Sequence, residues 1–308
     1  MSNSNKKPIL ITGSHRSGST WVGRMIALPS SVAYIHEPFN LHHRPGICKA
    51  KFDYWFPYIC DENQSFYLND IKDCLQFKYQ FVEELRTTKS TKDIARLLRD
   101  YILFTRYRIL KKRPLVKDPI AVFSTEWLAK SFDMDVVVLI RHPAAFAGSL
   151  KKSKWVYPFD HFLQQPLLIE HHLSEYRAEI DELSKTDKNI VDQAILLWNL
   201  IHHMILKYRD NNPNWIFVRH EDLSKHPVEG FSNLYDRLCL NFSTDIHQEI
   251  KKYSFADSSK ETLDLLMRNS RSNVWTWKTR LTDDEIRKIK ENTHEIASQF
   301  YTEKDWVE

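Results

Sequence analysis

The chain has 308 residues, of which 42% are hydrophobic and 13% aromatic, so it can bury a large core in one α/β domain or in two smaller ones. Its formal net charge of +4 is spread over interspersed acids and bases, which argues against a dedicated nucleic-acid-binding protein with a concentrated basic face. No linker-like segment or repeat interrupts the sequence. We therefore expect one domain over residues 8–308, after a flexible N-terminus at residues 1–7.

Strand-like and helix-like patterns alternate along the chain. In chain order they predict strand Ile9–Thr12, helix Trp21–Leu28, strand Val32–His36, helix Asp93–Leu110, strand Leu115–Val116, helix Thr125–Phe132, strand Val136–Ile140, helix Ala144–Lys152, helix Val191–Tyr208, strand Trp215–Val218 and helix Thr282–Ser298. This order predicts an α/β fold in which helices flank a parallel sheet, with ligands at the carboxyl ends of the strands. The aromatic-rich region of about 40–90 fits an insertion or lid.

Two further patterns limit the setting of the protein. The start lacks the apolar core of a signal peptide, and no apolar run approaches the roughly 18 residues of a membrane helix, so we expect no membrane span and a cytoplasmic location. The cysteines lack C-x-x-C spacing and histidine partners, which predicts no metal site. Reduced thiols fit a cytoplasmic protein, and disulfides among the first three cysteines stay open. The four are Cys48, Cys60, Cys74 and Cys239.

The segment Ile9–Thr20, ILITGSHRSGST, nearly matches the nucleotide-binding loop G-x-x-x-x-G-K-[ST]. Gly13 and Gly18 occupy the glycine positions, whereas Ser19 stands where the lysine belongs. Such a loop binds phosphate oxygens with backbone N–H groups at a helix N-terminus. Because the lysine that reaches the β- and γ-phosphates is missing, the pattern favours a loop that holds a single phosphate group.

A second strand-to-helix corner follows the strand Val136–Ile140. The strand runs directly into Arg141, and Pro143 stands near the first turn of the next helix. Ser149 lies about two turns along that helix. A guanidinium and a hydroxyl presented from one corner suit a second phosphate, although an R-H-P sequence taken alone is more often structural.

Together the two corners resemble those of sulfotransferases that use 3′-phosphoadenosine 5′-phosphosulfate (PAPS) and release 3′-phosphoadenosine 5′-phosphate (PAP). The resemblance rests on SHRSGSTW at 14–21, IRHPAAFAGSL at 140–150, FVRHEDL at 217–223 and WTWK at 275–278. It implies a P-loop NTPase-like sulfotransferase fold over nearly the whole chain. The first loop would hold the 5′-phosphosulfate end, and the Arg141 and Ser149 pair would hold the 3′-phosphate.

The form Arg-Ser-Gly-Ser, with HEPFN at 36–40, is more similar to carbohydrate-type and bacterial members than to the cytosolic phenol and steroid enzymes. In the latter, a strand reading Lys-Thr-His supplies a histidine base. Here the corresponding strand reads Leu115–Pro119, with proline at the position of that histidine. The base must therefore come from elsewhere.

The resemblance also implies roles for single residues. Arg16 would contact the sulfonate or the bridging oxygen, and Trp21 would border the adenine or anchor the first helix. Arg271 is carried over, on a loose match, from the family's late basic loop over the 3′-phosphate. Backbone N–H and hydroxyl groups would hold the 5′-phosphate, and they come from Ser17, Gly18, Ser19 and Thr20.

Our candidate for the catalytic base is Glu37, because carbohydrate-type relatives carry a glutamate there. We expect partial burial to raise the pKa of Glu37 toward neutrality. The alternatives are a structural pair of Glu37 with Arg16 or Arg24, and His36 as the base, although strand alternation turns its side chain away from that of Glu37.

The strand end at Lys117 and Asp118 points at the same crevice. Lys117 would help to neutralise the sulfonate, and Asp118 would position the acceptor or Lys117. A plain salt bridge between the two fits the pattern equally well. Glu37, His36 and Asp118 are thus the candidate contacts to the acceptor.

These assignments predict in-line sulfuryl transfer from PAPS, without a metal, to a hydroxyl or an amine of a small-molecule natural product or carbohydrate. One alternative is a P-loop kinase-like phosphotransferase, which would need a lysine at position 19. The other is a non-catalytic protein that binds anions or glycans.

Overall fold

The computed structural model describes residues 7–186, 189–254 and 274–307. Its contacts gather into two compact units. The first unit comprises the chain up to Thr12 together with Val22–Val137, and the second comprises Gly13–Trp21 together with the chain from Val138 onward. The expected single domain over residues 8–308 stays a prediction. The expected flexible N-terminus, residues 1–7, lies outside the described residues except for Lys7.

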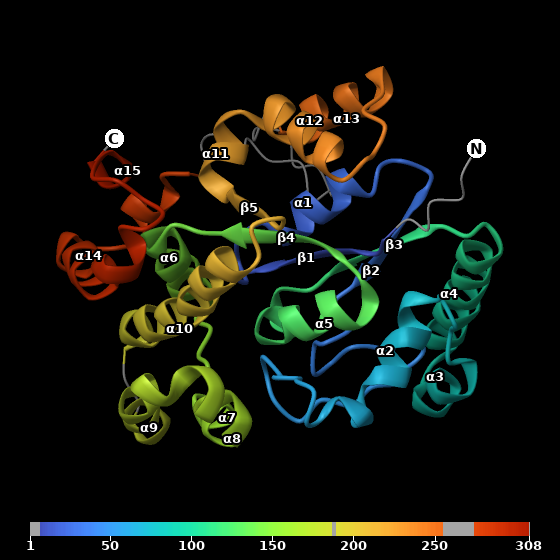
Figure 1. The fold of residues 1–308 in the computed structure, drawn as a ribbon, viewed down its shortest axis with the longest axis horizontal. Helices are drawn as coiled ribbons and strands as arrows, with labels where there is room; N and C mark the ends of the chain where they lie inside the picture. The colour runs from blue at the N-terminus through green and yellow to red at the C-terminus, as the bar shows by residue number, and fades with distance from the viewer. Residues whose placement is uncertain (1–6, 187–188, 255–273, 308) are drawn as a thin grey trace. The chain divides into compact units, whose positions relative to one another are not determined.

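One parallel five-stranded sheet has the strand order β2-β3-β1-β4-β5 (Figure 1). Its strands are β1 (Ile9–Gly13), β2 (Val32–His36), β3 (Arg113–Lys117), β4 (Asp135–Ile140) and β5 (Ile216–Arg219). The predicted α/β class and all five predicted strands are thereby confirmed. In the first unit Ile11 of β1 and His36 of β2 both lie opposite Lys117 of β3, so the carboxyl ends of these strands reach the same edge.

Helices connect the strands of the first unit, three of them between β2 and β3 and one between β3 and β4. They are α2 (Leu68–Leu75), α3 (Phe81–Thr87), α4 (Thr91–Ile109) and α5 (Thr125–Phe132). The longest, α4, begins where the Ser90 side chain accepts a hydrogen bond from the backbone N–H of Asp93, and it lies beside α3 (Figure 1). The region of 40–90 contains α2 and α3. Its function as a lid stays a prediction.

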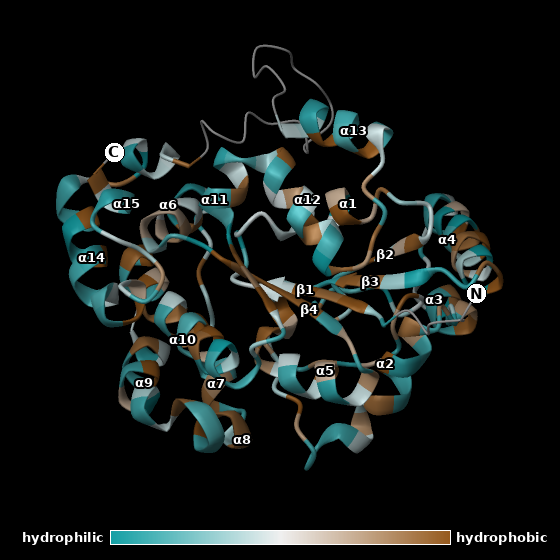
Figure 2. Ribbon diagram, turned by 45° about the horizontal axis from the view of Figure 1, so that its top comes forward, coloured by the Kyte–Doolittle hydropathy of each residue, from teal (hydrophilic) through white to brown (hydrophobic). Residues whose placement is uncertain are grey.

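The second unit is largely helical. Its helices are α6 (Pro143–Ser153), α7 (Asp160–Leu163), α8 (Pro166–Leu168), α9 (Arg177–Lys185), α10 (Ile190–Asn211), α11 (His220–Lys225), α12 (Pro227–Arg237), α13 (Thr244–Ser254), α14 (Asp283–Ala297) and α15 (Lys304–Val307). The connecting helix α1 (Ser19–Ile26) begins in this unit. α10 packs against α6 and α14, and Figure 2 shows apolar and polar residues alternating along α10. Thr282 and Glu285 form a capping box at the start of α14.

No helix in the described parts of the chain combines the length and the apolar character needed to cross a membrane. All four cysteines lie in described residues and are free, so the disulfides left open by the sequence are not formed in this structure.

Four histidines are buried in the described part of the second unit, namely His15, His142, His202 and His220. Burial lowers the pKa of His15, His142 and His202 to about 3. His202 stacks on Trp198 with 3.9 Å between ring centroids, and its Nδ1 lies 2.8 Å from the Trp198 carbonyl oxygen. These rings are therefore neutral in the folded protein at neutral pH, and folding must exclude protons from them.

We predict that the free energy of unfolding falls as the pH drops through the window from 6.5 towards 3, because the unfolded chain, with histidine pKa values near 6.5, binds more protons there. Between about pH 7 and about pH 5, each such histidine should lower the free energy of unfolding by about 2 kcal/mol. His202→Phe, which retains a ring against Trp198, should lose about 2 kcal/mol less than the wild type over this range. Urea unfolding at several pH values measures this, and identical losses in the two proteins would contradict it.

Candidate active site

The loop Gly13–Thr20 joins β1 to α1 and requires both of its glycines. Gly13 has φ of +117° and Gly18 has φ of +80°, which favour glycine. A Cβ atom on Gly13 would lie 2.2 Å from the carbonyl oxygen of Leu139, and one on Gly18 would lie 2.7 Å from the ring of His220. The backbone angles and these close contacts therefore require glycine at both positions of the loop.

The loop and the second corner meet within the second unit. The backbone N–H of Ser14 donates to the Leu139 carbonyl at the end of β4, at 3.1 Å. Arg16 Nε donates to Ser149 Oγ at 3.0 Å, and Arg16 Nη2 donates to Ser153 Oγ at 3.3 Å. Arg16 and Ser149, assigned from the sequence to opposite ends of one nucleotide, are therefore direct neighbours.

Positive charge collects at this junction. Arg141 is buried, and its Nε has no hydrogen-bond partner in the described part of the chain, although Glu221 Oε1 lies 3.6 Å away. Burial lowers the pKa of Arg141, Glu221 opposes that shift, and the charges of Arg280 and Arg16 add to it. A cluster of guanidinium groups with one carboxylate nearby is suited to an anion.

A second polar atom at the junction lacks a partner. Ser17 is fully buried, and its Oγ makes no hydrogen bond to any described residue. A buried hydroxyl without a partner costs about 1–3 kcal/mol unless a bound group satisfies it. The unpartnered atoms of Ser17 and Arg141 thus belong to the two segments for which the sequence predicted phosphate contacts.

Glu221 fixes the corner from which Arg141 projects. Its carboxylate accepts hydrogen bonds from the backbone N–H of His142 at 3.1 Å and from the Tyr301 hydroxyl at 3.0 Å. From α10, Trp198 Nε1 donates to the Arg141 carbonyl at 2.8 Å. Three distant segments therefore hold one turn in place.

Sequence reasoning missed two charged groups of this junction. Glu221 lies inside the quoted segment FVRHEDL, but nothing in that segment names its partners. Arg280 follows WTWK, and a Cβ on Gly148 of α6 would lie 3.6 Å from the Cβ of Arg280. Both groups act on Arg141 from positions that are distant in sequence, so only the fold reveals them.

The other residues predicted to contact the nucleotide differ in their exposure. Ser19 is buried and opens α1, whereas Thr20 is exposed. Trp21 is half-buried and its ring meets those of His220 and Phe231 edge-on, with centroids 6.0 and 5.1 Å away. Those contacts agree with the packing alternative for Trp21. Arg271 lies outside the described residues.

The first unit brings Glu37 and Lys117 together. Glu37 directly follows β2 with φ of +42°, and its backbone N–H donates to the Lys117 carbonyl at 2.9 Å. Lys117 Nζ forms an ion pair with Glu37 Oε1, while Asn40 Nδ2 donates to Oε2 at 2.9 Å. Lys117 is wholly buried and the Glu37 side chain is 21% exposed, so the carboxylate is the accessible member of the pair.

The expected upward shift of the Glu37 pKa is wrong. Burial acts in that direction, but the charge of Lys117 and hydrogen bonds from Lys117 and Asn40 outweigh it, and the pKa of Glu37 is lowered. Glu37 pairs with Lys117 of the neighbouring strand β3, and not with Arg16 or Arg24 as in the structural alternative. The carboxyl group whose pKa is raised is that of Asp118.

Asp118 is fully buried, and both of its oxygens accept backbone hydrogen bonds. Oδ2 accepts from Phe39 at 2.6 Å and Oδ1 from Ile120 at 3.0 Å. Burial raises the pKa of Asp118 to about 7, against the lowering effect of the Phe39 hydrogen bond, and the charge of Glu37 adds to the rise. Among the described residues, Asp118 makes no ion pair with Lys117. Its two hydrogen bonds instead tie together the turns that follow β2 and β3.

His36 occupies the last position of β2. Its Nδ1 lies 3.1 Å from the Tyr34 hydroxyl. Partial burial and the charge of Lys117 lower the pKa of His36, and the charge of Glu37 opposes this. His36 is therefore a neutral side chain at neutral pH, close enough to the ion pair to sense both charges.

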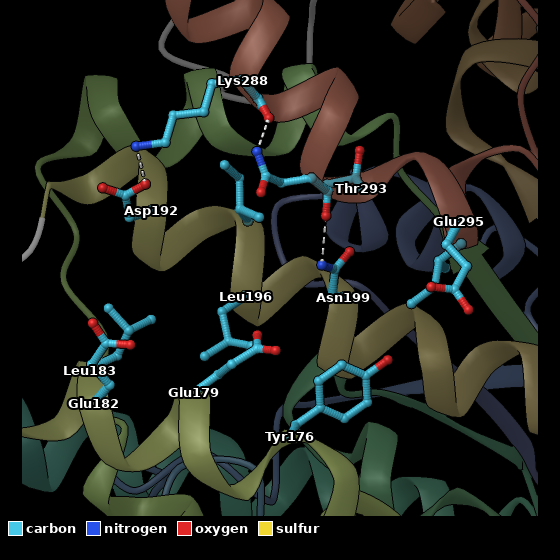
Figure 3. A pocket seen from close by; sticks show the side chains of 13 residues that line it. Tyr176, Glu179, Glu182, Leu183, Asp192, Leu196, Asn199, Lys288, Thr293 and Glu295 are labelled. Atoms are coloured by element: carbon cyan, nitrogen blue, oxygen red, sulfur yellow. Dashed lines mark hydrogen bonds and ion pairs between the residues drawn. The ribbon is translucent and has the colours of Figure 1, made fainter.

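A cavity of about 460 Å³ between α9, α10 and α14 is unsuited to an anionic nucleotide (Figure 3). Glu179, Glu182 and Glu295 contribute carboxylates to its lining. Its lysine, Lys288, is paired with Asp192 at 2.5 Å. The excess negative charge would repel phosphate, so this cavity is not a candidate nucleotide site.

A family model described as "Sulfotransferase family" matches residues 8–244 of this chain. Since the match spans most of the sequence, the chain belongs to the sulfotransferase family, and sulfuryl transfer is the activity class of that family. None of the curated proteins matches the sequence.

Several solved sulfotransferase structures are similar over most of their length. The sulfotransferase domain from the curacin biosynthetic pathway is 18% identical, with 95% of this chain and 96% of that chain covered and a TM-score of 0.46. The sulfotransferase domain of the Synechococcus PCC 7002 olefin synthase is 17% identical, with 98% of each chain covered and a TM-score of 0.47. Mouse SULT7A1, complexed with PAP, is 11% identical, with 95% and 85% covered and a TM-score of 0.48. The family assignment rests on the sequence match.

Proposed function

We propose that the protein transfers the sulfuryl group of PAPS to a hydroxyl, or an amine, of a small-molecule natural product or carbohydrate, without a metal and in the cytoplasm. The observation that carries this proposal is the direct contact between the two predicted phosphate corners, through the hydrogen bond from Arg16 Nε to Ser149 Oγ. A donor with a phosphate on each side of one ribose needs two such corners side by side. Family membership supplies the transfer of a sulfuryl group.

The loop would hold the 5′-phosphosulfate end. Backbone N–H groups of Ser17, Gly18, Ser19 and Thr20 would donate to the 5′-phosphate, as the loop geometry favours. The unpartnered Oγ of Ser17 would gain a hydrogen bond there. Arg16 would neutralise charge that develops on the bridging oxygen. Preorganised donors of this kind each lower a barrier by about 3 kcal/mol in enzymes.

The second corner would hold the 3′-phosphate. Arg141 offers a guanidinium Nε that makes no hydrogen bond in the described part of the chain, and Ser149 offers a hydroxyl that already accepts from Arg16. Glu221 holds the corner in position through His142, so that Arg141 is oriented before the nucleotide arrives. Trp21 beside the adenine, and Arg271 over the 3′-phosphate, remain parts of the proposal that rest on the family resemblance.

Glu37 is the proposed base. The acceptor oxygen would attack sulfur in line, its proton would pass to Glu37, and the bond from sulfur to the bridging oxygen would break, which leaves the charge on the PAP phosphate. Lys117 holds Glu37 ionised in the free protein, and a carboxylate must be ionised to accept a proton. If Lys117 turns towards the sulfonate, the pKa of Glu37 rises just when the proton is transferred. His36 and Asp118 complete the proposed acceptor contacts.

Arg141→Ala should weaken binding of PAP by about 30-fold or more, because it removes the partner of a buried phosphate, yet scarcely change binding of adenosine 5′-phosphate. Isothermal titration calorimetry with both nucleotides gives the comparison. Lys152→Ala, at an exposed lysine of the same helix α6, is the matched control and should bind both as the wild type does. Equal losses for the two nucleotides in Arg141→Ala would remove the 3′-phosphate assignment.

Glu37→Gln should bind PAP within about twofold of the wild type but transfer sulfate at least about 100-fold more slowly, because a general base contributes 10²–10⁴-fold. The acceptor is found first, in a screen of radiolabelled PAPS with sugars, phenols, guanidines and amines. Glu179→Gln, in the acidic cavity of Figure 3, is the control and should keep full activity. A wild type that binds PAP and transfers to no acceptor would instead support an anion-binding protein.

A further inference from the structure

Large apolar side chains are exposed mainly on one part of the first unit. Nine of the twelve that are exposed among the described residues lie between residues 82 and 110. They are Val82, Leu85, Ile94, Leu98, Tyr101, Ile102, Leu103, Ile109 and Leu110. Single exposed apolar residues are common on any protein, but their concentration on one segment marks an interaction surface.

The exposed apolar residues of α4 form a face of their own. α4 buries Leu97, Asp100 and Phe104, which define the side that packs inward. Ile94, Leu98 and Ile102 follow one another at intervals of one helical turn and lie on a different face, with Ile102 65% exposed. α3 lies beside α4 and adds Val82 and Leu85, and Figure 2 shows apolar residues on both helices.

The charges around these residues have one sign. Every exposed side chain from residue 81 to residue 112 that is charged at neutral pH is basic. These side chains are Arg86, Lys89, Lys92, Arg96, Arg99, Arg106, Arg108 and Lys111. The acids of the segment are at least partly buried, and two of them, Glu84 and Asp100, pair with Arg44.

Several of these cations are available to a partner. Lys92, Arg106, Arg108 and Lys111 form no ion pair with any residue that the structure describes. Glu83 and Asp93, whose side chains are 33% and 34% exposed, pair with Arg86 and Arg96 on the same helices. The four cations without an acidic partner still leave this surface with an excess of positive charge, which suits a partner with negative charge.

We propose that this surface, which we call the α3–α4 face, docks the protein on an anionic lipid bilayer. An interfacial helix combines an apolar stripe that enters the headgroup region with flanking lysines and arginines that meet acidic lipids. A second copy of the chain fits less well, because a symmetric contact would bring the two basic rims together. The inference rests on the first unit alone and does not depend on the proposed sulfuryl transfer.

Vesicle co-sedimentation tests the proposal with the full-length chain. The probes are vesicles of phosphatidylcholine alone and vesicles of equal parts phosphatidylcholine and phosphatidylglycerol. The wild type should bind the anionic vesicles at least about tenfold more tightly than the neutral ones, and added salt should weaken this binding. The double variant Ile102→Ser/Arg106→Glu should lose at least about tenfold in binding to the anionic vesicles.

The matched control is Val156→Ser/Lys251→Glu, which changes an exposed valine and an exposed lysine outside the α3–α4 face. It should bind the vesicles as the wild type does. Thermal unfolding of both variants establishes that they fold. Failure of the wild type to bind anionic vesicles, equal binding by the two double variants, or self-association without lipid that Ile102→Ser/Arg106→Glu abolishes would each overturn the proposal.

Discussion

The hydrogen bond between Arg16 and Ser149 joins two segments that are distant in sequence, and the proposed chemistry depends on it. It forms only because Gly13 lets the loop pass within hydrogen-bonding distance of the end of β4. Glu221 then fixes the turn after β4 through the His142 backbone and Tyr301. The result is a concentration of guanidinium groups with fewer carboxylates than cations, an arrangement that suits a bound anion.

In the first unit a different balance controls the candidate base. The Lys117 side chain is fully buried, and the Glu37 carboxylate compensates its charge. The same contact keeps Glu37 ionised, so a group that moves Lys117 away also makes Glu37 a stronger base. Asp118, buried just after Lys117, anchors the turn through Phe39 and thereby fixes the end of β2 from which Glu37 projects.

Much of this was predictable where the signal is local. Every predicted strand is found, and the Thr282 cap of α14 forms as its sequence indicates, because alternation, loop glycines and caps depend on neighbouring residues. The lowered pKa of Glu37 was not predictable, since its cause is a lysine 80 residues away in sequence. The apolar spacing of α4 correctly predicted a helix, but spacing alone does not tell which apolar residues face the core, and Ile102 faces outward.

The central claim is that the loop and the Arg141 corner bind one nucleotide with a phosphate at each end of its ribose. Calorimetric titration of the wild type with PAP, and separately with ATP and Mg²⁺, tests it most directly. Because Ser19 replaces the lysine that a triphosphate requires, we predict that PAP binds at least about 100-fold more tightly than ATP. Equal or tighter binding of ATP with Mg²⁺ would contradict the claim and favour a phosphotransferase.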